Sequence, residues 1–353
     1  MIEFSAEEAL TNYSKPLADW SVARRRMRSG RVLPHSKVTF SLQKSDTILT
    51  LGSCFARNVE THLSKFGCNV PALDMSGPES EINGQRLNRV IGLFTPPTFY
   101  QALVWAEQIR KRDCIVRPSD CDRFFFDTGN GAIVDLGLAQ PAKNSYLQCL
   151  ARRQQLYKLY ANAFTAECIM ITPGLVETWF DRKENLYTVT APLRNGQMFD
   201  SDRFSFRVLD CSECLESLLA TVDLIREHNP SVKFLITVSP VPLRYTFSDC
   251  DILIANTFSK CALRTACDEV IRKRPQIDYF PSFEAVTLST RKVWLKDRRH
   301  VDESMIGEIV AQVIRQYFEP ADSPFEDLQQ YKFNFGGRIR NVISKFFTGG
   351  SGG

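Results

Sequence analysis

The chain has 353 residues, of which 44% are hydrophobic and 24% are charged. This composition is typical of a globular protein with a full core. The 44 basic and 40 acidic residues leave a formal net charge of +4. This small charge excludes a strong positive potential over the whole protein of the kind that favours binding to nucleic acid or to an anionic membrane. We therefore expect one elaborated domain with small appendages and no nucleic-acid partner.

Targeting signals and metal-binding patterns are not apparent in the sequence. The segment IEFSAEEALTNYSK after Met1 lacks the basic start and apolar core of a signal peptide, and no later segment has about 18 uninterrupted apolar residues. We expect a cytoplasmic protein. The eleven cysteines are scattered and odd in number, which favours reduced, mostly buried thiols. Only Cys211 and Cys214 lie close together, without a second pair or a nearby histidine, so we expect no metal.

The first elements in chain order are an arm, a strand and a helix. Residues 1–44 contain the basic run ARRRMRSGR and little periodicity, so we interpret them as an irregular arm packed on the body. The basic run is either a solvated face or an anion contact. The segment TILTLGS (47–53) predicts a buried strand, and the apolar residues that follow at helical spacing predict a helix that ends at Gly67.

Strands and helices then alternate along the chain. The predicted elements are a strand at 168–174, a helix that ends at Asn229-Pro230, a strand at 232–242, a helix at about 255–273, a strand within 277–283 and a last helix around 306–314. This alternation predicts an α/β domain over residues 45–318 with a parallel sheet in a three-layer arrangement.

Two further segments interrupt or follow this pattern. About 100 residues separate the first two strands, which is too long for a plain crossover. They contain two predicted helices and a hairpin-like segment at 123–137, and we interpret residues 75–165 as an insertion that builds substrate surface. The basic, aromatic segment 319–348 is expected to dock on the body or a partner subunit, or to contact a membrane surface. We interpret residues 349–353 as an appended linker.

Ser53 is the first candidate for chemistry, since it ends a predicted strand and begins a predicted helix. Ligands bind at the carboxyl ends of parallel strands, and the backbone N–H groups at a helix N-terminus can stabilise an oxyanion. Serine is also a favoured N-cap, which explains the same corner without catalysis. Cys54 is the rival nucleophile, because a helix N-terminus lowers a thiol pKa. Since Phe55 follows it, we interpret Cys54 as a packed small residue.

His300 is the candidate base for this serine. The segment WLKDRRHVDESM puts it in a polar turn before the last helix, where a loop at the carboxyl edge of the sheet is expected. Asp297 precedes it by three residues, so that one turn can present both side chains and the carboxylate can fix the imidazole tautomer. The other histidines, in the arm, on the helix after Ser53 and at a helix end, are His35, His62 and His228.

Several blocks along the chain occur in a fixed order. They are LGSCFA (51–56), IGLFTPPTFYQAL (91–103), MITPGLVETW (170–179), TVSPVPLR, ANTFSKCALR, DYFPSFE and the final Asp-x-x-His at 297–300. Together they resemble the GSCFA family, a bacterial group similar to the SGNH/GDSL hydrolases. The resemblance spans roughly residues 45–315.

The resemblance implies a flavodoxin-like SGNH fold with a catalytic triad. In it, Ser53 would be the nucleophile, His300 the base and Asp297 the acid that orients it. The backbone N–H groups of Ser53 and Gly92 would form part of the oxyanion hole.

Two departures from the pattern concern this oxyanion hole. The third block of SGNH enzymes supplies an asparagine side chain, but Gly174-Leu175-Val176-Glu177 contains none. The second block has Leu93-Phe94-Thr95-Pro96 where the family has Tyr-Asn before the proline. Loss of one donor can cost about 10²–10³ in rate. Asn88 and Thr172 are the candidate replacements.

The expected function is acyl transfer through an acyl-Ser53 intermediate, by analogy on acetyl groups of carbohydrate. If water accepts the acyl group, the protein is an esterase. If a sugar hydroxyl accepts it, the protein is an O-acyltransferase that uses a donor such as acetyl-CoA, which a cytoplasmic location favours. No resident cofactor is expected, and no glycine-rich phosphate loop is present.

An inactive carbohydrate-binding or scaffolding protein on the same fold is the alternative. The missing asparagine supports it, whereas the retained Ser53, Asp297 and His300 argue against it. The aromatic segments RFFFD and ETWF are interpreted either as part of the core or as a surface that binds sugar, whether the protein is an enzyme or a binding protein. In the second interpretation, Trp179 and Glu177 are the candidate substrate-binding residues.

Overall fold

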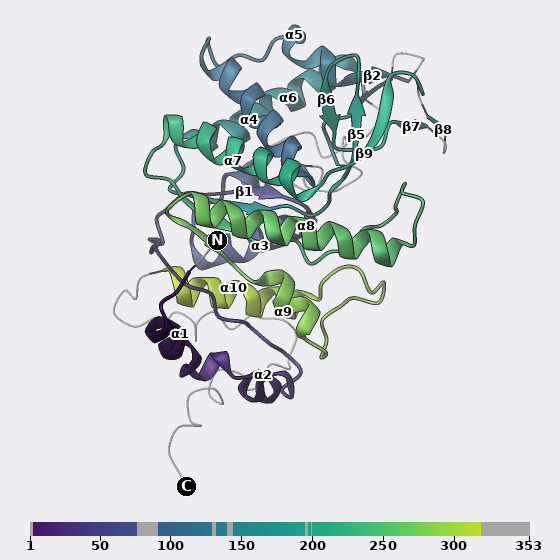
Figure 1. The fold of residues 1–353 in the computed structure, drawn as a ribbon. Coiled ribbons are helices and arrows are strands. Elements are labelled where there is room, and N and C mark those ends of the chain that lie inside the picture. The colour runs from purple at the N-terminus through teal and green to yellow at the C-terminus, as the bar shows by residue number, and fades with distance from the viewer. Residues whose placement is uncertain are drawn as a thin grey trace, which may run out of the picture. The chain divides into compact units, whose positions relative to one another are not determined.

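Four strands form a parallel sheet at the centre of the molecule (Figure 1). Their order is β1 (Ile48–Gly52), β4 (Cys168–Thr172), β10 (Lys233–Ile236) and β11 (Ile277–Tyr279). On the outer side of β1, Thr47 forms a parallel bridge with Asn69. The α/β class predicted from the sequence is therefore confirmed, and each predicted strand is present in shortened form.

This computed structural model describes residues 3–75, 91–128, 132–139, 144–194, 197–198 and 200–318, all of which belong to one compact unit, Met1–Phe318. The segments 319–348 and 349–353, for which the sequence predicts docking and a linker, lie outside the described residues. Among the described helices, none combines the length and the apolar character needed to cross a membrane. All eleven cysteines have free thiols, and six of them are buried.

Helices cover both faces of the parallel sheet (Figure 1). One face is covered by α3 (Cys54–Phe66), α9 (Ser282–Leu288) and α10 (Glu303–Tyr317). The other is covered by α4 (Pro96–Arg110), α6 (Tyr146–Ala161), α7 (Cys211–His228) and α8 (Ile252–Lys273). The right-hand side of Figure 1 is the edge where the strands end and where α3, α8 and α10 begin.

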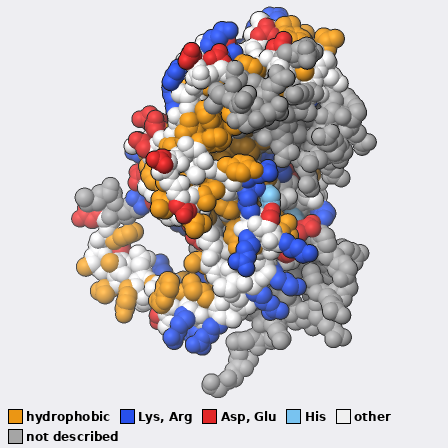
Figure 2. Space-filling view, turned by 90° about the vertical axis from the view of Figure 1, so that its right-hand side faces the viewer, with side chains coloured by type: hydrophobic (Ala, Val, Ile, Leu, Met, Phe, Trp, Pro, Cys, Tyr) orange, Lys and Arg blue, Asp and Glu red, His pale blue; other side chains and the backbone are white. Residues whose placement is uncertain are grey.

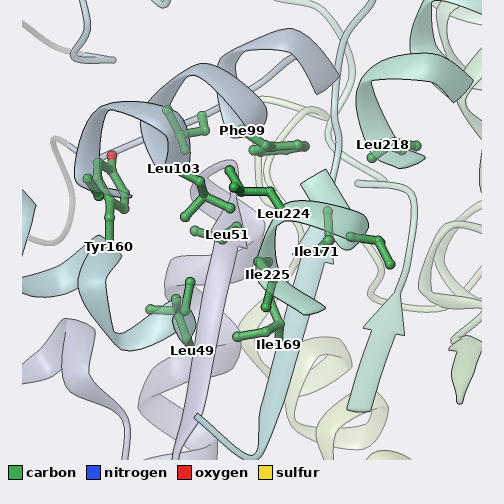
Figure 3. Close-up of a cluster of buried hydrophobic side chains, with 14 of the residues drawn as sticks. Leu49, Leu51, Phe99, Leu103, Tyr160, Ile169, Ile171, Leu218, Leu224 and Ile225 are labelled. Carbon is green, nitrogen blue, oxygen red and sulfur yellow. The ribbon is translucent and has the colours of Figure 1, made fainter. Parts of the chain in front are cut away.

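The main core lies between the sheet and the second group of helices. Leu49 and Leu51 of β1 and Ile169 and Ile171 of β4 point to this side, where they meet α4, α6 and α7 (Figure 3). Each of these side chains is almost completely buried. Burial of one such side chain contributes roughly 1.5–3 kcal/mol, so this layer holds the sheet in place.

The junction of β1 and α3 is held tightly. Gly52 has no room for a side chain, since a Cβ there would lie 2.7 Å from the Cβ and 2.8 Å from the carbonyl oxygen of Thr172. Arg57 of α3 donates to the carbonyl oxygen of Thr50 at 2.9 Å and forms a buried ion pair with Glu60 at 2.8 Å. These contacts fix the start of α3 against the end of β1.

The insertion has the predicted helices α4 and α6 and the predicted antiparallel hairpin of β2 (Phe125–Asp127) and β3 (Ile133–Asp135). A second antiparallel sheet, in the order β6 (Leu186–Thr188), β5 (Glu177–Asp181) and β9 (Phe204–Val208), was not predicted, because its strands are short and connected by polar segments. The remaining short elements are α5 (Pro118–Cys121), β7 (Leu193–Arg194), β8 (Gln197–Met198) and the 3₁₀ turns Pro16–Ala18, Pro71–Leu73, Asp122–Phe124 and Asn162–Phe164.

The N-terminal arm differs from the prediction of an irregular segment. It contains α1 (Ala6–Tyr13) and α2 (Trp20–Met27). Reciprocal hydrogen bonds between Ser5 and Glu8 cap α1, and Asp19 caps α2 by accepting from the N–H of Ser21 at 2.7 Å. Local caps can start short helices without strong apolar periodicity, so the prediction was wrong for these two segments.

Candidate active site

Ser53 lies at the carboxyl end of β1 and is 5% exposed. Its Oγ accepts a hydrogen bond from the N–H of Phe55 at 3.4 Å, so it acts as the N-cap of α3. The same hydroxyl donates to Oγ of Ser239 at 3.0 Å. Ser53 therefore has the structural role of a cap and also takes part in a buried polar contact across the sheet.

The loops after β4 and β10 meet at Ser53. A Cβ placed on Gly174 would lie 3.6 Å from the Cβ atoms of both Ser53 and Ser239. The N–H of Ser239 donates to the carbonyl oxygen of Pro173 at 2.9 Å. Ser239 was not singled out from the sequence, where it lies within the strand predicted at 232–242. The available signal was a serine near the carboxyl end of that strand, as Ser53 is at the end of the first one.

Three polar side chains of α8 bind the backbone of these two loops. All three come from the block ANTFSKCALR, and we call them the α8 clamp. The pairs are Lys260 Nζ with the carbonyl oxygens of Gly174 (2.7 Å) and Val241 (2.8 Å), Ser259 Oγ with the N–H of Val176 (3.0 Å), and Asn256 Oδ1 with the N–H of Leu243 (3.1 Å). The clamp joins the exits of β4 and β10 beside Ser53.

Lys260 is the buried cation of this site. It is 2% exposed, and burial lowers the pKa of its ammonium group to about 7, with Cys54 acting in the opposite direction and Arg299 adding to the shift. Sequence reasoning missed it. The signal was a lysine within the apolar face of α8, next to the buried residues Ala262 and Leu263.

Cys54 is disfavoured as a nucleophile by its surroundings. Burial raises the pKa of its thiol above the ordinary value, although Arg299 and Lys260 partly offset this effect. A neutral thiol is a poor nucleophile. The raised pKa therefore argues against Cys54 as the nucleophile.

His300 and Asp297 form a hydrogen-bonded pair in the loop before α10. The imidazole Nδ1 lies 2.5 Å from Oδ2 of Asp297, and the backbone N–H groups of Arg299 and His300 both donate to Oδ1 at 3.0 Å. The bonds from His300, followed by the one from Arg299, hold the pKa of Asp297 well below its usual range. Both side chains are about half exposed, at 44% and 48%.

Arg299 occupies the other side of the His300 ring. Its Nη1 lies 3.0 Å from Nε2 of the imidazole, and its Nε donates to the carbonyl oxygen of Pro242 at 3.2 Å. If Nδ1 carries the proton shared with Asp297, Nε2 accepts from the guanidinium. Figure 2 views this edge of the molecule, where a histidine side chain is visible beside basic and acidic side chains.

Ser53 and His300 are thus on the same edge of the sheet, but each has a different hydrogen-bond partner. Ser53 donates to Ser239, whereas Nε2 of His300 contacts Arg299. The structure brings Asp297 and His300 together and connects them to the Ser53 corner through Arg299, Pro242 and the α8 clamp.

The candidate oxyanion donors occupy different places. Gly92 lies beside the corner, because the N–H of its neighbour Leu93 donates to the carbonyl oxygen of Gly52 at 3.1 Å. Thr172 ends β4, and its side chain lines a small apolar cavity between the sheet and helices α3 and α10. Asn88 lies outside the described residues.

Glu177 and Trp179, the candidate substrate-binding residues, lie on β5 at the wall of a second cavity. Glu177 accepts from the hydroxyl of Thr246 at 2.6 Å, the hydroxyl of Ser248 at 3.1 Å and the N–H of Phe247 at 3.3 Å. Its carboxylate therefore holds the 246–248 loop. The ring centroid of Trp179 lies 5.4 Å from that of Phe206 and 5.1 Å from that of Phe247.

One group of side chains in the described residues has the spacing of metal ligands. Ligand atoms of Glu107, Glu227 and His228 lie within 4.8 Å of one another. Glu107 is already paired with Lys111 at 2.6 Å and with His228 at 2.8 Å. The group lies where α7 ends and the chain turns into β10, which is the edge of the sheet opposite Ser53 (Figure 1).

These observations define an α/β protein with a polar, serine-centred site at the carboxyl edge of a parallel sheet. Residues 47–313 match the GSCFA family. The match covers most of the chain, and the protein belongs to this family. A search of curated proteins found no match.

Proposed function

We propose that the protein is a serine-dependent acyl-ester hydrolase or O-acyltransferase with an SGNH-like fold. The hydrogen-bonded pair of Asp297 and His300 on the same sheet edge as Ser53 is the observation that carries the proposal. With Asn69 counted as a remnant of the second strand, the sheet has the 2-1-3-4-5 order of flavodoxin-like folds, which supports the SGNH-like assignment.

In the proposed first half-reaction, Nε2 of His300 takes the proton of the Ser53 hydroxyl while Oγ attacks the ester carbonyl carbon. The carbonyl electron pair moves onto oxygen, and the N–H groups of Ser53, Cys54 and Gly92 stabilise the resulting oxyanion. Asp297 stabilises the imidazolium. The oxyanion collapses, the alkoxide leaves with the proton from His300, and an acyl-Ser53 ester remains.

In the second half-reaction, His300 takes a proton from the acceptor hydroxyl, which belongs either to water or to a sugar. The acceptor oxygen attacks the acyl carbon, and Ser53 leaves with the proton that His300 returns. The acyl group thus passes to water or to the acceptor without a redox step. Acetyl groups on carbohydrate are the proposed substrate class, and a donor such as acetyl-CoA would serve the transferase reaction.

Arg299 has to leave Nε2 before His300 can act as the base. The lone pair that must accept the serine proton is directed at the guanidinium in this conformation. Hydrogen bonds in a resting site commonly rearrange when substrate binds. We therefore include movement of Arg299 as the step that opens the proposed reaction.

A carbohydrate-binding or scaffolding protein is the second candidate. The hydrogen bond of Ser53 to Ser239, the contact of His300 with Arg299 and the lack of an asparagine at 174–177 favour it. All three features are expected of a site that has lost catalytic activity.

Intact-protein mass spectrometry after incubation with a small activated acetyl ester separates the two candidates. An acetyl adduct or a burst of product in the native chain and in Cys54→Ala, absent in Ser53→Ala and His300→Gln, would support the enzyme. Circular dichroism of each variant is the folding control. No adduct and no turnover in folded native protein, with acetyl-CoA also tested, would support the binding protein instead.

A further inference from the structure

The first helix of the N-terminal arm, α1, is exposed along almost its whole length, and none of its residues is buried. Within the described chain, the hydrogen bonds of residues 5–28 all stay inside residues 5–33. Attachment to the body begins at Gly30, whose carbonyl oxygen accepts from the N–H of Arg291 at 2.8 Å. An isolated helix shorter than about 12–15 residues is marginal in water, so the eight residues of α1 need a surface to pack against.

The arm also exposes a group of large apolar side chains. They are Phe4 (57% exposed), Leu10 (68%), Tyr13 (81%), Leu17 (55%) and Trp20 (73%). Helices α1 and α2 lie near the bottom of Figure 1 and at the lower left of Figure 2, where hydrophobic side chains project from the arm. Single apolar residues on a surface are ordinary, whereas a group of them is typical of an interaction site.

Acidic and basic side chains are separated along this arm. Glu3, Glu7 and Glu8 belong to α1 or precede it, and Arg24, Arg25, Arg26 and Arg28 belong to α2 or follow it. Four of the five exposed apolar residues lie between these groups in the sequence. Such a surface is complementary to itself when a second copy is turned by half a turn, because the acidic end of each copy then meets the basic end of the other.

The charge of the arm fits a second copy better than it fits a membrane. Residues 3–28 contain four acidic and five basic residues, so an anionic lipid surface would attract the basic end and repel the acidic end. Phe4, Tyr13 and Trp20 together expose roughly 300–500 Å². This is about half of the roughly 800 Å² that each partner buries in a standard interface, and the leucines and the charged side chains add to it.

We infer that residues 3–28 form an interface with a second copy of this chain. In it, Leu10, Tyr13 and Trp20 meet their counterparts around a two-fold axis, and α1 of each copy contacts α2 of the other. The second copy supplies the apolar surface that α1 lacks in the single chain. The inference is independent of the reaction proposed at Ser53, because none of the residues placed in that site belongs to the arm.

Sedimentation velocity of the full chain, at concentrations up to about 100 μM, measures its oligomeric state. We expect a dimer that Leu10→Ser and Trp20→Ser each weaken by about tenfold or more, because a few central apolar side chains carry most of the binding energy of an interface. Leu147→Ser, at a leucine of α6 that is 74% exposed, is the matched control and should leave the dimer unchanged. Thermal melting shows whether each variant is folded.

Charge reversal tests which ends meet. The two multiple variants are Glu3→Lys with Glu7→Lys, and Arg24→Glu with Arg25→Glu and Arg28→Glu. Glu8 and Arg26 stay unchanged, because Glu8 caps α1 and Arg26 donates to the carbonyl oxygen of Leu33. Each variant places like charges opposite each other and should weaken the dimer, most strongly at low salt. All five substitutions in one chain exchange the two ends and should recover most of the lost affinity.

Three results would overturn the inference. One is a native chain that stays monomeric at about 100 μM. Another is a dimer that Leu10→Ser and Trp20→Ser weaken no more than Leu147→Ser does, since the interface would then lie elsewhere. The third is a monomer that binds vesicles of anionic phospholipid and loses this binding in Trp20→Ser, which would make the arm a membrane contact. If the five substitutions together fail to restore affinity, the two-fold pairing of α1 with α2 is wrong.

Discussion

Two histidine–carboxylate pairs lie at opposite edges of the parallel sheet. At the carboxyl edge, Nδ1 of His300 is 2.5 Å from Asp297. At the amino edge, Nε2 of His228 is 2.8 Å from Glu107. Each imidazole also has an arginine near its second nitrogen, at 3.0 Å for His300 and at 3.4 Å for His228. The local chemistry of the two pairs is nearly the same.

Their surroundings differ in ways that matter for chemistry. The carboxyl edge has the N-terminus of α3, the buried hydroxyls of Ser53 and Ser239 and the α8 clamp. His228 lies instead in the last turn of α7, with its ring 5.0 Å from that of Phe164. A helix C-terminus stabilises a cation and offers no oxyanion donors. The pair of His228 and Glu107 thus has a structural role, whereas the pair of His300 and Asp297 is a candidate for catalysis.

The sharpest test of this comparison is to remove each imidazole in turn. His300→Gln should lower turnover of an activated acetyl ester by about 10⁴–10⁶, because the proposed base is lost. His228→Gln should change it less than about twofold. Steady-state ester hydrolysis measures both. Equal losses in the two variants would remove the functional distinction between the edges.

The carboxylates provide the second test. Asp297→Asn should lower turnover by about 10³–10⁴, because an amide can hold the imidazole in the wrong tautomer. Burial by itself would raise the pKa of Glu107, but hydrogen bonds from Lys111 and His228 outweigh it and lower the pKa. Glu107→Gln should therefore reduce stability in urea unfolding and leave turnover of the folded protein unchanged. A large loss of turnover in Glu107→Gln would contradict this assignment.

Lys260→Met tests the α8 clamp through activity and pH dependence. Loss of its bonds to Gly174 and Val241 should lower turnover about tenfold. The pKa of Lys260 is about 7 in the folded chain and 10.5 ordinarily, so between these values the unfolded chain binds more protons and stability rises with pH. In the native chain the free energy of unfolding should increase by up to about 5 kcal/mol over this pH range, and Lys260→Met should lack this increase. Urea unfolding at several pH values measures it, and parallel pH curves for both proteins would argue against the lowered pKa.

Arg299→Ala has the smallest expected effect and the opposite sign. Removal of the guanidinium exposes Nε2 of His300, so turnover of a small neutral ester should rise about two- to fivefold. Arg298→Ala, at an exposed neighbouring arginine, is the control. A fall in turnover for Arg299→Ala alone would mean that the guanidinium supports the reaction and does not block it.

The sequence contains enough information for the sheet and for the pairing of Asp297 with His300. Apolar runs and the Gly67 stop predict β1 and α3 almost to the residue, since these signals are local. The contacts of Ser239, Lys260 and Arg299 depend on how distant loops meet, and no local pattern encodes that meeting. A lysine on a helix is normally read as solvent-exposed, yet Lys260 finds two carbonyl oxygens inside the protein.

Because of the α8 clamp, side chains beside this site can vary during evolution while the loops keep their course. Its side chains bond to the main chain of the loops at Gly174, Val176, Val241 and Leu243, and main-chain atoms stay the same when a side chain is replaced. Positions 175 and 243, whose side chains line the cavity beside β5, can therefore vary while the loops keep their course. If the proposed reaction is correct, substitutions at these two positions should change substrate preference and leave the Ser53 corner intact.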